Sequence, residues 1–144
     1  MIGATALLGA GVAHAVVAEP SAGAHQLCGT VYSGAPLADN HPSPDSGVPD
    51  NAVPAEGVQV VGTLVPSTGT PTTFPAVATN SSGQYCLQGN AGLVATILGG
   101  GHVTLTTAGV TPIAVSHPTG IYQADFQNHQ VGLTGATGFN IVVP

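Results

Sequence analysis

The chain of 144 residues contains no lysine and no arginine, and its six acidic residues give a formal net charge of −6 with neutral histidines. A protein without cationic side chains cannot neutralise a phosphate backbone or dock electrostatically on anionic lipid, which argues against nucleic acids and acidic membranes as partners. Its 21 glycines and 12 prolines favour short strands joined by turns over helices. The length suits one domain plus a tail.

The N-terminal segment, residues 1–25, is an apolar stretch followed by a linker of small residues. The sequence Ala13-His14-Ala15 resembles a signal-peptide cleavage site, although the positively charged start of a signal peptide is missing. As a membrane span the stretch is barely long enough and rich in glycine. If it is retained as a strand, one side carries larger apolar residues, among them Ile2, Leu8, Val12 and Val16. We therefore expect either a signal remnant or a strand donated to another subunit.

The domain itself is expected to span residues 26–144. Its first strand, Leu27 to Tyr32, alternates so that Leu27 and Val31 face inward and Cys28 faces outward. A long proline-rich loop follows and carries Asp39, Asp45 and Asp50. These acids are either a calcium site or part of a solvated loop, and their spacing matches no known calcium loop.

Two further segments precede the middle of the chain. The segment from Gly57 to Val65 reads as a strand with Val58 and Val60 inward, and a bulge would explain the broken alternation at Val61-Gly62. The Thr- and Pro-rich stretch 66–75 is expected to be an exposed loop or an edge.

A turn at residues 79–83 then feeds a strand. Asn80 and the serines after it can hydrogen-bond their own backbone, and Gly83 can adopt a positive φ. Tyr85 and Leu87 then face inward, and Cys86 faces outward.

Three motifs in this order resemble the carboxypeptidase-regulatory-like and Cna-B-like family of prealbumin-type β-sandwiches. The motifs are Gly29-Thr30-Val31, then Pro54, Gly57, Val58 and Val60, then Thr79, Gly83, Tyr85 and Leu87. The resemblance covers roughly residues 26 to 90 and implies a β-sandwich of the kind that often serves as an accessory module in larger secreted proteins. The chain departs from the family at residues 92–97, and the family's isopeptide cross-links cannot form without a lysine.

Cys28 and Cys86 both face outward, on strands that the resemblance places near one another. Two cysteines without metal-type spacing, after a signal-like start, favour a disulfide in an oxidising compartment. We expect this bridge on the outside of one sheet, in a protein that is secreted or lies at the cell surface. Two free buried thiols are the alternative.

The remaining chain shows short apolar runs separated by turn residues. Strands are expected at 93–98, where a short helix is the alternative, and at 102–107, 110–115, 121–126, 130–133 and 139–143. The fold is therefore expected to be all-β, a single antiparallel β-sandwich of about 7–10 short strands. Its expected core includes Val31, Val58, Val60, Tyr85, Leu87, Val103 and Leu105.

No catalytic or metal motif is evident. The histidines at positions 14, 25, 41, 102, 117 and 129 are scattered, without metal-ligand spacing. No Gly-x-Ser-x-Gly elbow marks a serine nucleophile, and the few acids do not suggest a glycosidase pair. We expect no enzyme activity, no cofactor and no bound metal.

Two functions remain, besides a third and simpler alternative, a bare stabilising spacer. The first is a structural subunit that forms a homo-oligomer or polymer, as a filament or surface layer, with residues 2–16 donated between subunits. The second is a secreted adhesive or ligand-binding module with an unknown small-molecule ligand. Three tyrosines, three phenylalanines and no tryptophan argue against a sugar-stacking site, which leaves assembly as the first expectation.

Overall fold

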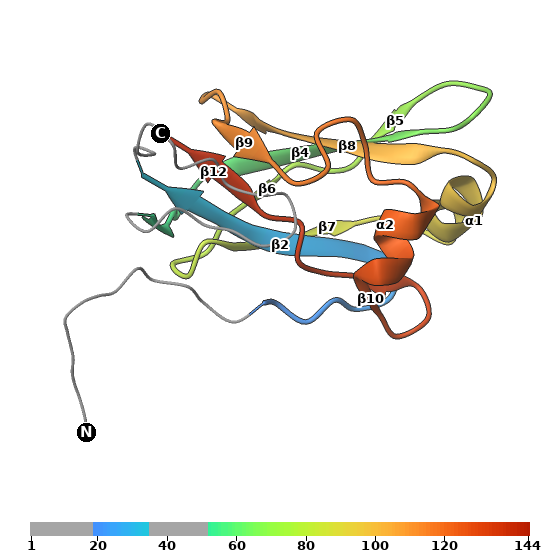
Figure 1. Cartoon of the computed structure of the whole chain (residues 1–144), viewed down its shortest axis with the longest axis horizontal. Helices are drawn as coiled ribbons and strands as arrows, with labels where there is room; N and C mark the ends of the chain where they lie inside the picture. Colours follow the sequence, from blue (N-terminus) through green and yellow to red (C-terminus); the bar gives the residue numbers. More distant parts are fainter. Residues whose placement is uncertain (1–18, 35–51) are drawn as a thin grey trace.

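The computed structural model describes residues 19–34 and 52–144, with the chain coloured from blue to red in Figure 1. Two sets of residues singled out in the sequence lie outside this range. They are the proposed donor residues Ile2, Leu8, Val12 and Val16, and the loop acids Asp39, Asp45 and Asp50.

The described chain is mostly β, arranged as a seven-stranded and a four-stranded sheet (Figure 1). The seven-stranded sheet consists of β2 (Gln26–Ser33), β3 (Val53–Pro54), β7 (Gln84–Gln88), β9 (Ala114–Val115), β10 (Gln130–Val131), β11 (Gly135–Ala136) and β12 (Ile141–Val143). The four-stranded sheet consists of β4 (Gln59–Val65), β5 (Thr72–Thr73), β6 (Val77–Ala78) and β8 (His102–Ala108). The expected all-β class is confirmed.

Strand β2 is the centre of the larger sheet. Its first half pairs antiparallel with β7, and its second half pairs parallel with β12, where Val31 lies opposite Ile141. Strand β11 also runs parallel to β2. The larger sheet is therefore mixed, not antiparallel throughout as expected. The parallel partners β2 and β12 are separated by most of the domain, and a connection of that length allows the crossover that a parallel pair requires.

The two sheets bury one shared hydrophobic core. Val31, Tyr85 and Leu87 enter it from the larger sheet, and Val60 and Val103 from the smaller one. The expected core is confirmed for these five residues. Val58 and Leu105, also expected there, are half-buried against its margin.

The bulge expected at Val61-Gly62 is wrong. The ladder between β4 and β8 runs without interruption through both residues. Gly62 breaks the sequence alternation for another reason: a Cβ there would lie 2.6 Å from Cδ1 of Leu87, which packs on it from the opposing sheet. The glycine makes room for the core instead of shifting the register.

Two segments expected as strands are helices. Residues 93–98 lie in α1 (Gly92–Leu98), which buries Leu93 and Ile97 one turn apart. The strand expected at 121–126 is replaced by α2 (Gln123–Asn128), which buries Phe126. The Tyr122 N–H at its start donates to Asp125 Oδ2 at 3.0 Å and so caps the first turn.

The remaining C-terminal strands lie where they were expected, and all but one of them are shorter than expected. The segment 102–107 lies within β8, whereas those at 110–115, 130–133 and 139–143 shrink to β9, β10 and β12. Turns and short loops occupy the difference.

Candidate functional site

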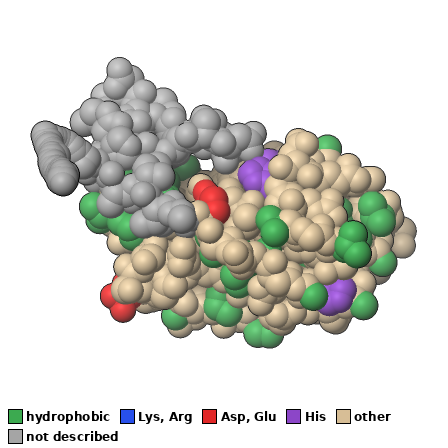
Figure 2. Space-filling view, turned by 90° about the horizontal axis from the view of Figure 1, so that it is seen from below, with side chains coloured by type: hydrophobic (Ala, Val, Ile, Leu, Met, Phe, Trp, Pro, Cys, Tyr) green, Lys and Arg blue, Asp and Glu red, His purple; other side chains and the backbone are tan. Residues whose placement is uncertain are grey.

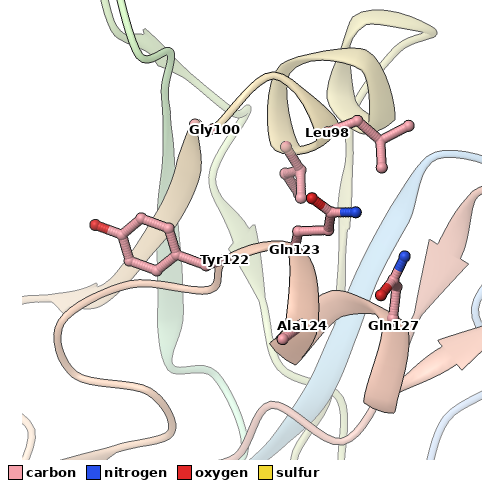
Figure 3. Close-up of a pocket in the computed structure, with 8 residues that line it drawn as sticks. Leu98, Gly100, Tyr122, Gln123, Ala124 and Gln127 are labelled. Atoms are coloured by element: carbon pink, nitrogen blue, oxygen red, sulfur yellow. The ribbon is translucent and has the colours of Figure 1, made fainter.

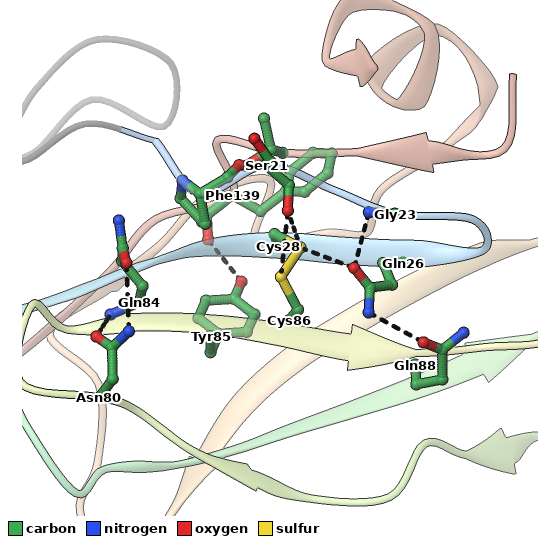
Figure 4. The surroundings of a disulfide bond; sticks show 12 residues. Ser21, Gly23, Gln26, Cys28, Asn80, Gln84, Tyr85, Cys86, Gln88 and Phe139 are labelled. Atoms are coloured by element: carbon green, nitrogen blue, oxygen red, sulfur yellow. Dashed lines mark hydrogen bonds between the residues drawn. A yellow bond between two sulfur atoms is a disulfide. The ribbon is translucent and has the colours of Figure 1, made fainter. Parts of the chain in front are cut away.

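The disulfide between Cys28 and Cys86 joins β2 to β7 on the outer face of the larger sheet (Figure 4). The expected pairing and face are thus present. Cys28 is nevertheless fully buried, because residues 19–25, called here the strap, lie over it; the carbonyl oxygen of Ser21 is 3.9 Å from Sγ of Cys28 and 3.8 Å from Sγ of Cys86. A disulfide of this kind indicates an oxidising environment.

Hydrogen bonds hold the strap at both ends. The Thr137 hydroxyl donates to the Pro20 carbonyl at 2.7 Å, and the Gln88 amide donates to the Ala24 carbonyl at 3.2 Å. The strap therefore fixes the place on the domain from which the N-terminal segment departs.

Tyr85 is a structural side chain and not a reactive one. Its hydroxyl donates to the Phe139 carbonyl at 2.6 Å. Gly29 makes this approach possible, because a Cβ there would lie 2.0 Å from the same carbonyl oxygen. Burial, with a smaller contribution from the negative charge of Glu19, raises the pKa of the Tyr85 phenol well above its usual range. The phenol stays protonated and anchors β7 to the segment before β12.

Two histidines that are separate in sequence meet near α2. The rings of His117 and His129 are perpendicular, with centroids 5.5 Å apart, and His117 Nε2 lies 3.3 Å from Asp125 Oδ1. The Ser116 hydroxyl is 2.7 Å from His117 Nδ1, and Ser116 is only 2% exposed. Within residues 19–34 and 52–144, no group of three or more histidine, cysteine or acidic side chains is placed to hold a metal.

A shallow hollow of about 350 Å³ lies between α1 and α2 (Figure 3). The exposed side chains of Leu98 and Tyr122 border it, with the amides of Gln123 and Gln127. The Tyr122 ring stacks on His102, with centroids 4.7 Å apart. No lining residue is charged.

Strand β8 has an open edge. Val103 and Ile121 exchange backbone hydrogen bonds of 3.1 and 2.8 Å, so the backbone N–H and C=O groups of Val103 point away from β4. In an antiparallel ladder the backbone N–H and C=O groups of every second residue point the same way. The backbone groups of Leu105 and Thr107 therefore also point away from β4. For these two residues the described chain offers no backbone partner on that side.

A second open edge borders an apolar groove of about 260 Å³ between the two sheets. We call it the β5–β7 groove; it is lined by Leu64, Thr72, Thr73, Phe74, Pro75, Gln88, Gly89, Asn90 and Leu93. The stretch 66–75 was expected to be a loop or an edge, and β5 confirms the edge.

Both margins of the groove are edge strands. The Phe74 N–H donates to the Gly62 carbonyl at 2.9 Å, so in β5 the polar groups of Thr73 face away from β4. Directly after β7, the Gly89 N–H donates to the His25 carbonyl at 2.8 Å. By the same alternation, the backbone N–H and C=O groups of Cys86 and Gln88 face away from β2.

The edges carry no charged side chain. Within the described ranges the acidic residues are Glu19, Glu56 and Asp125, and none lies on β5, β7 or β8. The face in Figure 2 is accordingly dominated by polar uncharged atoms with scattered hydrophobic side chains, and few acidic ones. Leu133, 88% exposed, is an example of an apolar side chain in solvent.

Sequence reasoning missed the histidine pair, the hollow and the groove, because each is assembled from segments far apart in the chain. No protein-family model, curated protein or solved structure matches the chain. In the part of the chain that the structure describes, no helix is long and apolar enough to span a membrane.

Proposed function

We propose that this protein is a non-enzymatic extracellular structural subunit that assembles with copies of itself into a filament or surface layer. The observation that carries the proposal is the set of open, uncharged edges at β5, β7 and β8. The motifs that resemble the carboxypeptidase-regulatory-like family agree with a secreted β-sandwich.

Open edges normally bear devices that prevent pairing with other chains. Natural sheets protect their edges with lysines, inward-pointing charges, prolines or covering segments. This chain has no lysine at all, and β5, β7 and β8 carry Thr, Gln, Cys, His102 and apolar residues; the prolines nearest to an edge, Pro71 and Pro75, flank β5 and do not lie in it. With a net charge of −6 spread over 144 residues, the repulsion between copies is also weak. Edge pairing between copies is therefore favoured over a dispersed monomer.

Electron microscopy and light scattering of the full chain test the proposal. We expect elongated or sheet-like particles, and scattering that rises with protein concentration. A variant with Thr73→Lys and Thr106→Lys places a charge on two exposed edge positions and should assemble less. The control, Thr68→Lys with Thr70→Lys, adds the same charge to an exposed loop and should assemble like the parent. A parent chain that stays monomeric at millimolar concentration would refute the proposal.

The hollow between α1 and α2 favours a second function, a ligand-binding module. Tyr122 is 42% exposed and its ring is held by the stack on His102. The neighbouring amides of Gln123 and Gln127 can both donate and accept hydrogen bonds. Although the low aromatic content argues against a sugar-stacking site, the exposed Tyr122 ring and the neutral lining suit an uncharged, hydroxyl-rich ligand such as a saccharide.

Titration with neutral oligosaccharides, followed by nuclear magnetic resonance, tests this second function. Shifts should be confined to the Tyr122 and Gln127 signals and disappear in Tyr122→Ala. The matched control, Leu133→Ala, removes an exposed apolar side chain that does not line the hollow and should leave binding unchanged.

A further inference from the structure

We infer that the β5–β7 groove receives the apolar N-terminal segment, residues 2–16, of a second copy of the chain. The inference rests on the proposed self-assembly and names the two surfaces that meet. It assigns the groove as the acceptor and the segment before the strap as the donor.

The groove offers both kinds of contact that an added strand needs. Its margins present outward-facing backbone groups of Thr73 on β5 and of Cys86 and Gln88 on β7. Its walls include the apolar side chains of Phe74 and Leu93. An incoming strand can therefore hydrogen-bond to an edge while every second side chain enters the groove. The open edge of β8 does not line the groove, so it offers backbone hydrogen bonds but no apolar wall.

The N-terminal segment has the matching composition. It has no charged residue before Glu19, and in an extended conformation its even positions are Ile2, Ala4, Ala6, Leu8, Ala10, Val12 and Val16, apart from His14. The opposite side carries mostly small residues, three glycines, two alanines and Thr5, with Leu7 as its one large apolar residue. Fifteen extended residues span roughly 50 Å at about 3.3 Å each.

The course of the strap favours the groove of another copy over the chain's own. Read backwards, the strap runs from Ala24, which is bonded to Gln88 beside the groove, to Ser21, which lies over Cys86. Because β7 runs from Cys86 towards Gln88, the chain leaves the domain heading away from its own groove. To fill that groove the segment would have to reverse direction, whereas the segment of a second copy has no such constraint.

Paired substitutions in the full chain test the inference. Leu8→Asp with Val12→Asp puts two charges on the side that would enter the groove. Thr5→Asp with Gly9→Asp puts the same charges on the opposite side. We expect the first variant to need at least tenfold more protein to assemble, and the second to assemble like the parent.

Amide hydrogen exchange locates the contact. In the parent assembly the amides of at least one edge, Thr73 on β5 or Cys86 and Gln88 on β7, should exchange at least tenfold more slowly than in the monomeric Leu8→Asp, Val12→Asp variant. Pepsin is the suitable protease for the readout, because the chain has no lysine or arginine for trypsin.

The outcomes separate the inference from the proposed function. If both aspartate variants assemble equally well, or the groove amides stay unprotected in the assembly, the inference is wrong while self-assembly stands. If these amides are already fully protected in a dilute monomer, the N-terminal segment fills the groove of its own chain, and the inference is overturned. An assembled protein whose chains begin after Ala15 would overturn it as well. A parent chain that never assembles refutes the proposed function itself.

Discussion

Replacing Tyr85 tests the assignment of the core most directly. The side chain is 3% exposed, lies between the two sheets and donates its hydroxyl hydrogen to the Phe139 carbonyl. Tyr85→Ala removes a buried aromatic ring, and comparable truncations cost about 3–5 kcal/mol of unfolding free energy. Tyr85→Phe keeps the ring but leaves the carbonyl without its donor, a loss of about 1–3 kcal/mol. The difference between the two variants separates packing from hydrogen bonding.

The same residue gives a pH signature. An unfolded tyrosine loses its proton near pH 10, whereas burial raises the pKa of Tyr85 in the folded protein. Above pH 10 the unfolded chain therefore binds fewer protons than the native one, and the stability contributed by the protonated phenol is lost as pH rises. The expected slope from this residue approaches about 1.4 kcal/mol per pH unit, and Tyr85→Phe should lack it.

Urea unfolding followed by circular dichroism at pH 8 and pH 11 measures both effects. The parent should lose more stability between the two pH values than Tyr85→Phe does. If Tyr85→Ala costs less than about 1 kcal/mol, the ring is not in the core and the register of β7 is wrong. Equal pH dependence of the parent and Tyr85→Phe would show that the phenol is not buried in the folded protein.

Three further predictions concern the scaffold. Reduction of the disulfide should add two hydrogens to the mass of the protein. Replacing Cys28 and Cys86 by alanine should lower the unfolding free energy by about 4 kcal/mol, because the bridge spans 58 residues. Alkylation of both thiols without reductant would contradict the disulfide. Gly62→Ala should cost about 1–3 kcal/mol, and Gly29→Ala should cost more, because the added methyl meets a side chain that can shift at position 62 but a backbone carbonyl at position 29. Thermal melts rank the two variants, and the reverse order would contradict the packing. Asn80→Ala should cost about 1–2 kcal/mol in the same assay, because its Oδ1 accepts two backbone N–H groups of the turn at 2.9 Å; an unchanged melt would mean that the turn closes without it.

The strands that the sequence predicted well are those with one face in the core. Around Tyr85 and along β2, apolar and polar residues alternate with a period of two, and turn residues mark the ends. The same alternation places Cys28, Thr30 and Tyr32 on the outward face of β2, yet all three are buried. Such burial depends on what packs over the strand, and alternation carries no information about that.

Helix α2 was missed, and α1 was expected only as the alternative to a strand, because their sequences favour strands locally. Residues 92–98 contain β-branched side chains in a short apolar run, which strands and buried helices share. The distinguishing signal was the spacing of four between Leu93 and Ile97, both buried on one helical face. For α2 the signal was Asp125, three residues after Tyr122, which is the capping arrangement of a helix start.

The candidate assembly surfaces were predictable only in part. The sequence indicated an edge at residues 66–75 and a lack of protecting charge, since both are local or compositional. The groove was not predictable, because it forms where β5, the end of β7 and α1 meet, and sequence patterns do not specify how segments from different sheets are placed together.

The central position of β2 also bears on how the chain folds. This first strand of the domain binds the last one, and the Thr30 N–H donates to the Asn140 side chain, 110 residues away. Such a topology has a high contact order, so folding pays a large loop-closure entropy before the sheet is complete, and β-rich domains of this kind fold in about milliseconds to seconds. During synthesis β2 has no partner on its β12 side until residues 141–143 have left the ribosome, so the larger sheet is completed only after nearly all of the domain has been made.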